Sequence, residues 1–220
     1  MHRKRGLFVC FTGVDGSGKT TLAKTLVSIM KKESIGVKYV YNRYIPIVLR
    51  PVMLMGEFLF LRNKDFYRNY ADYSNTKRRA SKNHPLLAKF YQHLLLLDYF
   101  IQILFKIKLP LLFGKNIICD RYIYDTIVTD LSIDFNYSEG DVKNSLDKIL
   151  SLFPTPDITF LVDLPEKIAY QRKNDIPSIG YLKERRKIYL YLGKEYDMRI
   201  LDGSKKLAEL QCEVEKEVFQ

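Results

Sequence analysis

The distribution of apolar residues divides the chain into short buried strands separated by helical stretches. Five short runs are almost continuously apolar, which is the pattern of parallel strands that are covered on both faces. These runs are Leu7 to Phe11, Val37 to Tyr41, Asn116 to Cys119, Asp157 to Val162 and Met198 to Leu201. The sequence therefore predicts a five-stranded parallel sheet.

Helical periodicity fills the intervals between these runs. Leu22, Leu26 and Ile29 recur on one helical face directly after the first run. The segment from Ile45 to Phe113 has no strand-like alternation and is expected to be mostly helical. Further helices are expected over Ile123 to Asp130, Asp141 to Phe153, Pro165 to Tyr170 and Leu207 to Val218. Strands alternating with helices predict an α/β fold in which helices flank the sheet.

Length and charge narrow the classes of function. A chain of 220 residues suits a single domain, residues 1–220, with a buried central sheet. The 36 basic and 25 acidic residues give a net charge of 36 − 25 = +11, which favours anionic partners such as nucleotides. We find no nucleic-acid-binding module, and we expect no nucleic-acid partner. The most apolar region, Leu86 to Phe113, is interrupted by charges and lacks the span of roughly twenty apolar residues that a membrane helix needs.

The cysteines indicate a reducing compartment. Cys10, Cys119 and Cys212 are an odd and widely spaced set, and two of them lie inside apolar strand-like runs. Such cysteines suit small buried residues better than a disulfide framework or a metal site. The basic N-terminus precedes an apolar run that is too short for a signal peptide. We therefore expect a cytoplasmic protein.

A glycine-rich loop after the first strand carries the strongest chemical signal. Gly13, Gly18, Lys19 and Thr20 have the spacing G-x-x-x-x-G-K-[ST]. Glycines let the loop curl so that backbone N–H groups surround a polyphosphate, and the helix that follows points its positive end at the same group. Lys19 is expected to reach the β and γ oxygens, and the Thr20 hydroxyl to bind Mg²⁺. The expected ATP-binding residues are Gly13, Gly16, Ser17, Gly18, Lys19, Thr20 and Thr21.

Two charged residues end the third strand. Ligands of open α/β sheets bind at the carboxyl ends of the strands, so Asp120 and Arg121 are expected to face the phosphate loop. Asp120 could hold Mg²⁺ through water, and Arg121 could bind an acceptor phosphate with its planar guanidinium. The alternative is a structural ion pair that caps the strand.

Two polar segments have less specific signals. The segment from Asn63 to Asn83 could bind phosphate, although such a run is more often a solvated loop or helix face. Its basic residues include Lys77, Arg78, Arg79 and Lys82. Residues 172–181 combine polar residues with Pro177 and Gly180 and lead into a basic helix. That composition suits a mobile basic lid as well as an ordinary surface turn.

The landmarks together resemble the thymidylate kinase family, a group of P-loop nucleoside monophosphate kinases. They are GVDGSGKTT, Asn42-Arg43 with Pro46, CDRY, VDLPE and LDGS, in this order along the chain. The resemblance implies the P-loop NTPase fold with a lid, and transfer of the ATP γ-phosphoryl group to a nucleoside 5′-monophosphate such as dTMP, with Mg²⁺.

The resemblance also implies roles for single residues. Lys19 and Thr20 match the donor-phosphate and metal residues, and Asp120 matches an acid that organises Mg²⁺. Arg121 and Arg43 match arginines that bind the acceptor phosphate, whereas Asp15 matches a loop carboxylate that approaches the acceptor sugar. The variable loop positions hold no basic residue, so the lid has to supply a catalytic cation. Arg172 is the expected catalytic lid residue, with Lys173 as its neighbour.

Departures from the family pattern concern the acceptor. Aligned on the third strand, the places of a thymine-stacking Phe and a thymine-binding Arg hold Leu95 and Tyr99, which we expect to flank the base. Most of the surrounding apolar run is expected to be core. Asp125 replaces a small polar residue, and its carboxylate would repel an acceptor phosphate unless Arg121 or another cation paired with it.

Alternative functions remain at this stage. The altered base-binding positions would allow a P-loop kinase of a different acceptor, either a nucleoside or another small metabolite. A nucleotide-binding regulatory ATPase would bind ATP without acceptor-stimulated turnover. Family members commonly form homodimers through helices, and the apolar excess between Leu86 and Phe105 permits a homodimer here.

Overall fold

The computed structural model describes residues 5–43, 50–51, 54–55, 58, 76, 79, 82–131, 138–173 and 175–219. Several sequence predictions concern residues outside this set. Pro46, Lys77 and Arg78 lie outside the described residues. So do most of residues 48–61, within the expected helical segment that begins at Ile45, and most of the segment from Asn63 to Asn83.

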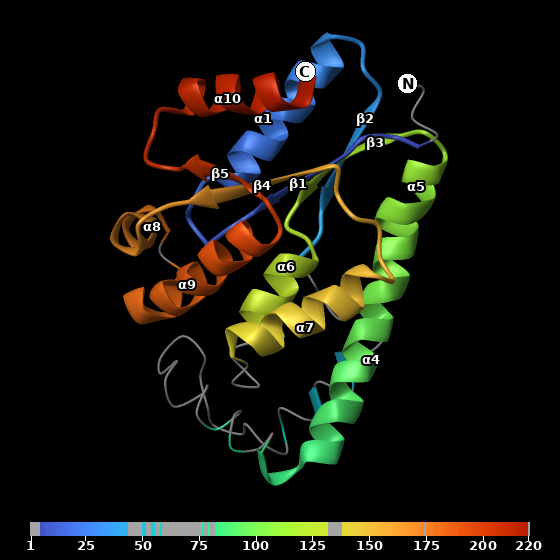
Figure 1. The fold of residues 1–220 in the computed structure, drawn as a ribbon, viewed down its shortest axis with the longest axis vertical. Helices are drawn as coiled ribbons and strands as arrows, with labels where there is room; N and C mark the ends of the chain where they lie inside the picture. The colour runs from blue at the N-terminus through green and yellow to red at the C-terminus, as the bar shows by residue number, and fades with distance from the viewer. Residues whose placement is uncertain are drawn as a thin grey trace.

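The centre of the molecule is a parallel sheet of five strands (Figure 1). The strands lie in the order β2-β3-β1-β4-β5, and every neighbouring pair is parallel. Their bounds are β1 Phe8–Thr12, β2 Val37–Tyr41, β3 Asn116–Asp120, β4 Ile158–Asp163 and β5 Arg199–Asp202. The predicted five-stranded parallel sheet is thus confirmed, with strand ends within one residue of those expected.

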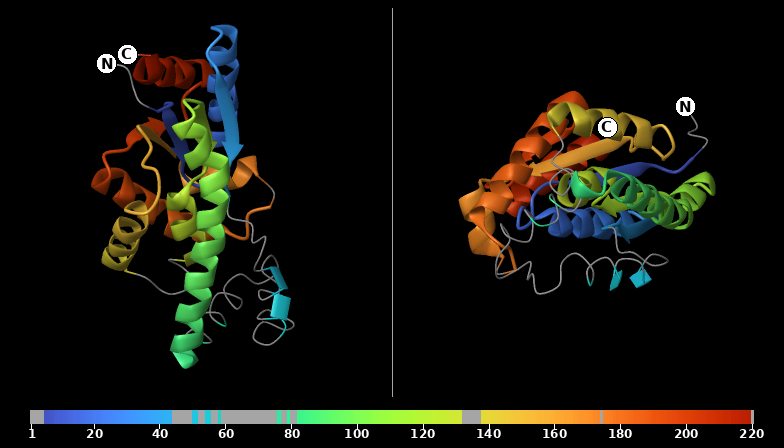
Figure 2. Two further views of the ribbon diagram at one scale, coloured as in Figure 1. Left: turned by 90° about the vertical axis from the view of Figure 1, so that its right-hand side faces the viewer. Right: turned by 90° about the horizontal axis from the view of Figure 1, so that it is seen from below.

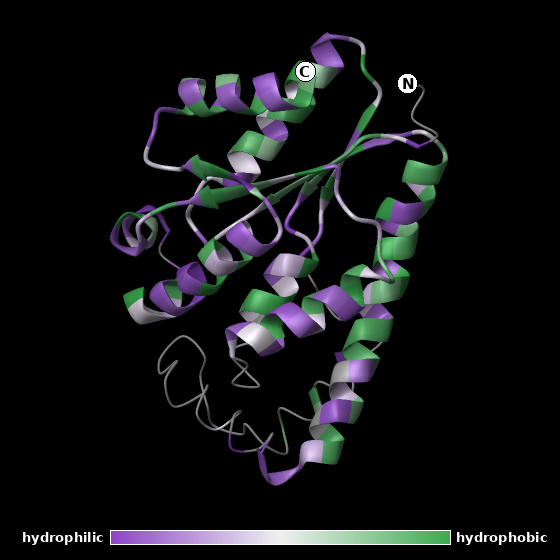
Figure 3. Ribbon diagram, in the orientation of Figure 1, coloured by the Kyte–Doolittle hydropathy of each residue, from purple (hydrophilic) through white to green (hydrophobic). Residues whose placement is uncertain are grey.

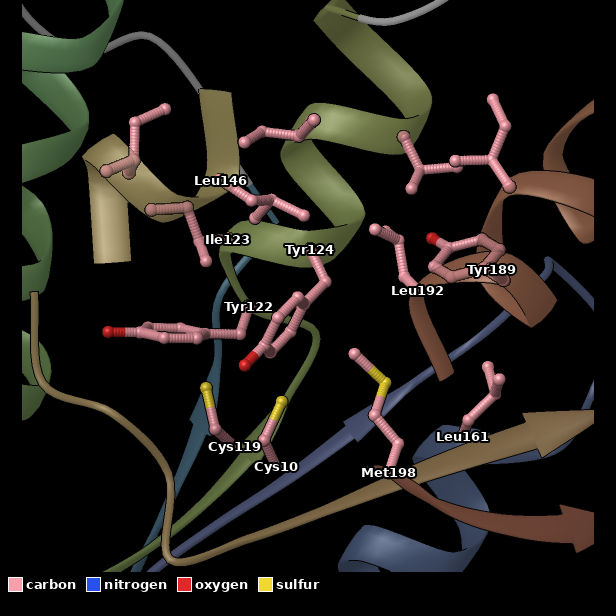
Figure 4. Packing of buried hydrophobic residues seen from close by; sticks show 14 of the residues in the cluster. Cys10, Cys119, Tyr122, Ile123, Tyr124, Leu146, Leu161, Tyr189, Leu192 and Met198 are labelled. Atoms are coloured by element: carbon pink, nitrogen blue, oxygen red, sulfur yellow. The ribbon is translucent and has the colours of Figure 1, made fainter. Parts of the chain in front are cut away.

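Side chains of the central strand alternate between two cores. Val9 and Phe11 are fully buried under α1 (Lys19–Lys32) and α10 (Leu207–Phe219), on one face of the sheet. Phe8 and Cys10 point to the other face, where the remaining helices form the larger core. Figure 4 shows part of this second core, with Cys10 and Cys119 beneath the tyrosines of α6. Both faces are therefore covered, which explains the continuous apolar runs.

The second face carries most of the helices. These are α4 (Pro85–Ile103), α5 (Leu109–Leu112), α6 (Ile123–Thr126), α7 (Glu139–Leu150), α8 (Glu166–Arg172) and α9 (Ile179–Glu195). Two π-helical turns, η1 (Leu104–Lys108) and η2 (Ile127–Leu131), continue α4 and α6. The expected helix from Ile123 to Asp130 is therefore helical throughout but widens after its first turn.

Pro110 gives a physical reason for the first wide turn. A proline lacks the N–H group that an α-helix would direct at the carbonyl four residues earlier, and its ring crowds that carbonyl. The carbonyl in question belongs to Lys106, inside η1, and it accepts a hydrogen bond from Lys38 Nζ at 3.3 Å instead. The π turn lets the helix pass the proline without ending.

α4, η1 and α5 form one long helical column along the flank of the molecule, and α4 extends past the sheet (Figure 2). Among the described helices, none is both long enough and apolar enough to cross a membrane. The column leads directly into β3, so it ends beside the strand that carries Asp120 and Arg121.

Candidate active site

The loop between β1 and α1 has the conformation that its glycines predict. Gly13 and Gly16 have φ angles of 135° and 83°, in the region that residues with a side chain rarely adopt. A Cβ atom on Gly13 would lie 2.5 Å from the Val162 carbonyl oxygen, and one on Gly16 would lie 2.6 Å from the Ala169 carbonyl oxygen. The loop therefore curls tightly against β4 and α8, and glycine is required at both positions.

Lys19 lies at the start of α1 and curls back into this loop. Its ammonium group donates to the Val14 carbonyl oxygen at 2.6 Å and to Ser17 Oγ at 3.4 Å. Burial of the side chain, with the positive charge of Arg121 as the next contribution, lowers the pKa of Lys19 to about 8. The influence of Arg121 also shows that the loop and the end of β3 share one electrostatic environment.

Asp120 connects the end of β3 to α1. Its Oδ2 atom accepts hydrogen bonds from Thr20 Oγ1 at 2.6 Å and from the Tyr39 hydroxyl at 2.9 Å. Its Oδ1 atom is buried and has no hydrogen-bond partner among the residues that the structure describes. Mg²⁺ prefers oxygen ligands and usually binds one or two carboxylates, phosphates and water. An orphaned carboxylate oxygen beside a threonine hydroxyl fits such an ion.

Arg121 directly follows Asp120 and forms ion pairs with two carboxylates. Its backbone has a φ of 70°, and its side chain is 9 % exposed. Nη2 pairs with the Asp15 carboxylate, while Nη1 lies 3.4 Å from Asp125 Oδ1. Burial would lower the pKa of Arg121, but Asp125 and Asp15 outweigh it and raise that pKa, so the guanidinium stays charged.

The carboxylate of Asp15 keeps its charge for a related reason. Burial alone would raise the pKa of Asp15, but the positive charges of Arg121, Lys19 and Lys173 hold it well below its usual value. Asp15 is therefore an anion in the middle of three cations. Of the residues expected at the acceptor side, the structure brings Asp15 and Arg121 into direct contact.

The carboxylate of Asp125 has several polar partners in addition to Arg121. Besides Arg121, it accepts hydrogen bonds from Thr12 Oγ1 at 2.8 Å, from the Tyr122 backbone N–H at 3.0 Å and from the Tyr189 hydroxyl at 2.9 Å. Burial, opposed by Arg121 and Lys19, raises the pKa of Asp125. The pairing that the sequence required of Asp125 is thus present.

The two expected lid cations point to different places. Arg172 Nη1 donates to the Gly203 carbonyl oxygen at 3.2 Å, on the turn after β5. Lys173 Nζ lies 3.8 Å from Asp15 Oδ1 and 3.1 Å from Asp175 Oδ1. In this conformation Lys173, rather than Arg172, reaches the phosphate loop.

Leu95 and Tyr99, which were expected to flank the acceptor base, are buried in this structure. Tyr99 is fully buried and Leu95 is 4 % exposed. The Tyr99 hydroxyl accepts a hydrogen bond from Asn42 Nδ2 at 2.7 Å. Both side chains belong to the core between α4 and the sheet. Arg43, which follows Asn42, is exposed.

Sequence reasoning missed two residues that shape the site. Tyr39 binds Asp120, and Tyr189 binds Asp125. Each lies on a different element from its partner, and the pairing depends on strand order and helix orientation. Asn42, which the sequence offered only as part of a landmark, binds Tyr99.

Comparisons with known proteins place the chain in a family. No protein-family profile matches it. A protein described as probable thymidylate kinase 1 of Saccharolobus solfataricus is 30 % identical over 207 residues, which cover 90 % of this chain and 88 % of that protein. A probable thymidylate kinase of Sulfurisphaera tokodaii is 29 % identical over 210 residues, covering 92 % and 90 %. The thymidylate kinase of Plasmodium falciparum is 27 % identical over 229 residues, covering 98 % and 91 %. Since these similarities span nearly the whole chain and include the elements that build the site, the chain belongs to the thymidylate kinase family of nucleoside monophosphate kinases.

Proposed function

We propose that this chain transfers the γ-phosphoryl group of ATP to dTMP and releases ADP and dTDP. The observation that carries the proposal is the contact between the donor and acceptor sides of the site. Asp15, on the phosphate loop, pairs with Arg121, which directly follows the Asp120 that binds Thr20 of the same loop. A phosphate held by the loop and a phosphate held by Arg121 would therefore lie next to each other.

The phosphate loop is proposed to hold ATP. Backbone N–H groups of the loop and of the first turn of α1 would surround the β and γ phosphates, and Ser17, Gly18 and Thr21 lie in this stretch. Lys19 would exchange its bonds to Val14 and Ser17 for the phosphate oxygens, and a dianionic phosphate would raise the pKa of its ammonium group again.

Thr20 and Asp120 are the proposed Mg²⁺ residues. When bound, the ion would neutralise negative charge on the phosphates. Tyr39 and Thr20 both bind Asp120 Oδ2 and so leave Oδ1 as the carboxylate oxygen that is available to the ion or its water.

The acceptor phosphate is proposed to bind Arg121, with Arg43 as a further arginine from the end of β2. Asp15 would leave the guanidinium and approach the acceptor sugar. Phosphoryl transfer needs little covalent help from the protein, because positioning and charge neutralisation account for most of the catalysis.

Residues 172–181 are proposed to act as the lid. Lys173 already contacts the loop carboxylate Asp15, so it is the nearer source of the cation that the phosphate loop lacks. Arg172 is also proposed to be catalytic, and would have to leave the Gly203 carbonyl to reach the phosphates.

ADP release across a panel of acceptors tests the function. The panel consists of dTMP, dUMP, dCMP, dAMP, dGMP and thymidine, each with ATP and Mg²⁺. We expect the highest kcat/KM with dTMP and no turnover when Mg²⁺ is chelated. Turnover of thymidine in place of dTMP would overturn the assignment of the acceptor. ATP hydrolysis that no acceptor stimulates would overturn the assignment as a kinase.

We also propose that the chain forms a homodimer through the α4 column. Large apolar side chains on this column are exposed. Figure 3 shows that apolar residues recur along the whole column. The exposed stripe consists of Leu86, Phe90, Leu97, Ile101 and Phe105, with spacings of four or seven residues, and Leu112 is exposed beyond the π turn. Such spacing puts the five side chains along one helical face, and an exposed apolar face of this length is typical of an interface.

Light scattering after gel filtration tests the dimer. Phe105→Glu would place a charge in the middle of the stripe and is expected to yield monomers, because a buried unpaired carboxylate costs several kcal/mol. Lys115→Glu, on the loop just beyond α5, introduces the same charge outside the stripe and should remain dimeric. A monomeric wild-type protein at micromolar concentration would contradict this proposal.

The remaining assignments are proposals of the same kind. We propose a single kinase domain over residues 1–220, since one sheet collects all five described strands. Cys10 and Cys119 are free and buried, which supports a reducing compartment such as the cytoplasm. We propose no nucleic-acid partner, and a salt-dependent binding measurement with single- and double-stranded DNA would test this.

A further inference from the structure

The two carboxylates that grip Arg121 are held in different ways. Asp125 faces Nη1 and Asp15 faces Nη2, while Nε of Arg121 has no hydrogen-bond partner among the described residues. A phosphate binds an arginine best through two N–H groups on one edge, and Nη2 and Nε form such an edge. Asp15 is the carboxylate that occupies part of this Nη2 edge.

Asp125 is fixed from three elements. Thr12 at the end of β1, the Tyr122 backbone at the start of α6 and Tyr189 in the middle of α9 all donate to it. Its side chain is 3 % exposed. Moving it would leave three buried donors without an acceptor, and an unsatisfied buried donor is costly. Asp125 therefore stays in place.

Asp15 has no comparable support. Among the described residues its polar contacts are with two cations, Arg121 and Lys173, and it lies on the phosphate loop rather than within a helix or strand. Phosphate oxygens offer these cations the same charge-assisted bonds with a larger negative charge. Asp15 can therefore be exchanged for a phosphate without leaving a neutral buried donor unpaired.

α9 carries the support for Asp125 and also follows the lid residues. Arg185 and Tyr189 lie one turn apart on α9, and they bind Thr129 and Asp125, which lie one turn apart on the α6 helix and its continuation. Figure 4 shows Tyr189 extending from α9 with its hydroxyl directed toward α6. The contact thus joins the helix after the lid to the helix after Arg121.

We propose that Asp125, held by Tyr189, is a positioning residue that fixes the Nη1 edge of Arg121, so that the Nη2 edge can exchange Asp15 for the acceptor phosphate. The proposal rests on the proposed function, because it assigns the acceptor phosphate to Arg121. It predicts opposite effects for the two carboxylates. Loss of Asp15 removes a competitor for the guanidinium, whereas loss of the Asp125 anchor lets the guanidinium leave its binding position.

Binding of inorganic phosphate, measured calorimetrically in saturating ADP and Mg²⁺, tests this directly. ADP occupies the phosphate loop, and inorganic phosphate has no sugar that Asp15 could contact. We expect Asp15→Asn to tighten phosphate binding about threefold and Asp125→Asn to weaken it about tenfold, since hydrogen bonds to charged groups are worth about 1.5–3 kcal/mol.

Tyr189→Phe is the sharper variant, because it removes one hydroxyl and changes no charge. It is expected to weaken phosphate binding about fivefold, less than Asp125→Asn does, because it removes one of the hydrogen bonds that hold Asp125 and leaves the carboxylate in place. Tyr191→Phe, two residues further along α9, is the matched control and should bind phosphate like the wild type. Thermal midpoints of all four variants would show whether each is folded.

The outcomes separate this inference from the proposed function. Tighter binding by Asp125→Asn, unchanged binding by Tyr189→Phe, or no phosphate binding by the wild type would each overturn the inference. The predicted opposite shifts in a protein that does not phosphorylate dTMP would support the inference and overturn the proposed function alone.

Discussion

The donor and acceptor sides of the site are built by different means. The donor side is mostly backbone, in which a curled loop and one helix N-terminus present N–H groups, and Lys19 and Thr20 follow in the same stretch. The acceptor side consists of side chains from separate elements that converge on Arg121. Backbone sites are specified by local sequence, whereas convergent sites depend on the complete fold. The following predictions measure how independent the two sides are.

The largest effect is expected on the donor side. Lys19→Ala should lower kcat/KM for ATP about a thousandfold, because removing one preorganised group that stabilises transition-state charge costs a factor of about 10²–10³. Steady-state kinetics with varied ATP would measure it. The Kd of dTMP, determined calorimetrically without ATP, should change little. A comparable loss of dTMP binding would contradict the separation of the two sides.

Arg121→Lys should be the next largest and should affect the acceptor. A lysine keeps the charge but cannot bind two oxygens with a planar fork, and it cannot satisfy Asp15 and Asp125 together. We expect kcat/KM for dTMP to fall about a hundredfold, within the 2–5 kcal/mol typical of a disrupted buried charge pair. The Kd of ATP is the control. An unchanged KM for dTMP would remove Arg121 from the acceptor side.

Variants of Lys173 and Arg172 test which of these two cations stabilises the phosphoryl group between the donor and the acceptor. Lys173→Ala and Arg172→Ala should each lower kcat more than they weaken ATP binding, and we expect a loss of about tenfold or more for Lys173 because stabilisation of transition-state charge is lost. Turnover under saturating substrates and the Kd of ATP would be compared for both variants. Full activity of either variant would exclude that residue from the mechanism.

The smallest effect is a pH dependence of the donor side. The pKa of Lys19 is lowered to about 8, so the free enzyme loses this proton as the pH rises through 8. Because the protonated form binds phosphate, kcat/KM for ATP should fall about tenfold per pH unit above 8, whereas kcat should fall less. The stability contribution has the opposite sign, since a folded-state pKa below the unfolded value makes the protein gain stability from pH 8 to about 10.5.

Lys19→Arg provides the control for this pH profile. A guanidinium does not titrate in this range, so the decline above pH 8 should disappear even if the overall activity is lower. Persistence of the same decline in this variant would assign it to another group.

Much of the fold could be predicted because both faces of the sheet are covered. β3 was located within one residue, since buried parallel strands are continuously apolar. β2 was located without error although it is an edge strand in which only Val40 is buried. The phosphate loop could also be predicted, because Gly13 and Gly16 adopt conformations that only glycine tolerates so close to a neighbouring backbone. In both cases a local property of the chain determines the structure.

The acceptor side could be predicted only in part. Asp120 and Arg121 followed from their place at a strand end, but Tyr39, which binds Asp120, and Tyr189, which binds Asp125, come from other elements of the fold. Leu95 and Tyr99 were aligned with base-flanking positions through the landmark motifs, and such an alignment does not reveal that both side chains are buried in the structure.

The left-handed backbone of Arg121 has a mechanical consequence. Successive residues of an extended strand project to opposite faces, so a regular β3 would send the side chains of residues 120 and 121 apart. The φ of 70° at Arg121 ends that alternation, while the Arg121 N–H still bonds to the Phe11 carbonyl oxygen at 2.9 Å and the Asn42 N–H to the Asp120 carbonyl oxygen at 3.0 Å. Hydrogen bonds to both neighbouring strands therefore fix the positions of Asp120 and Arg121 relative to each other. Inserting a single residue between Asp120 and Arg121 would shift the proposed acceptor site relative to the proposed metal site by about 3 Å, more than an in-line transfer tolerates.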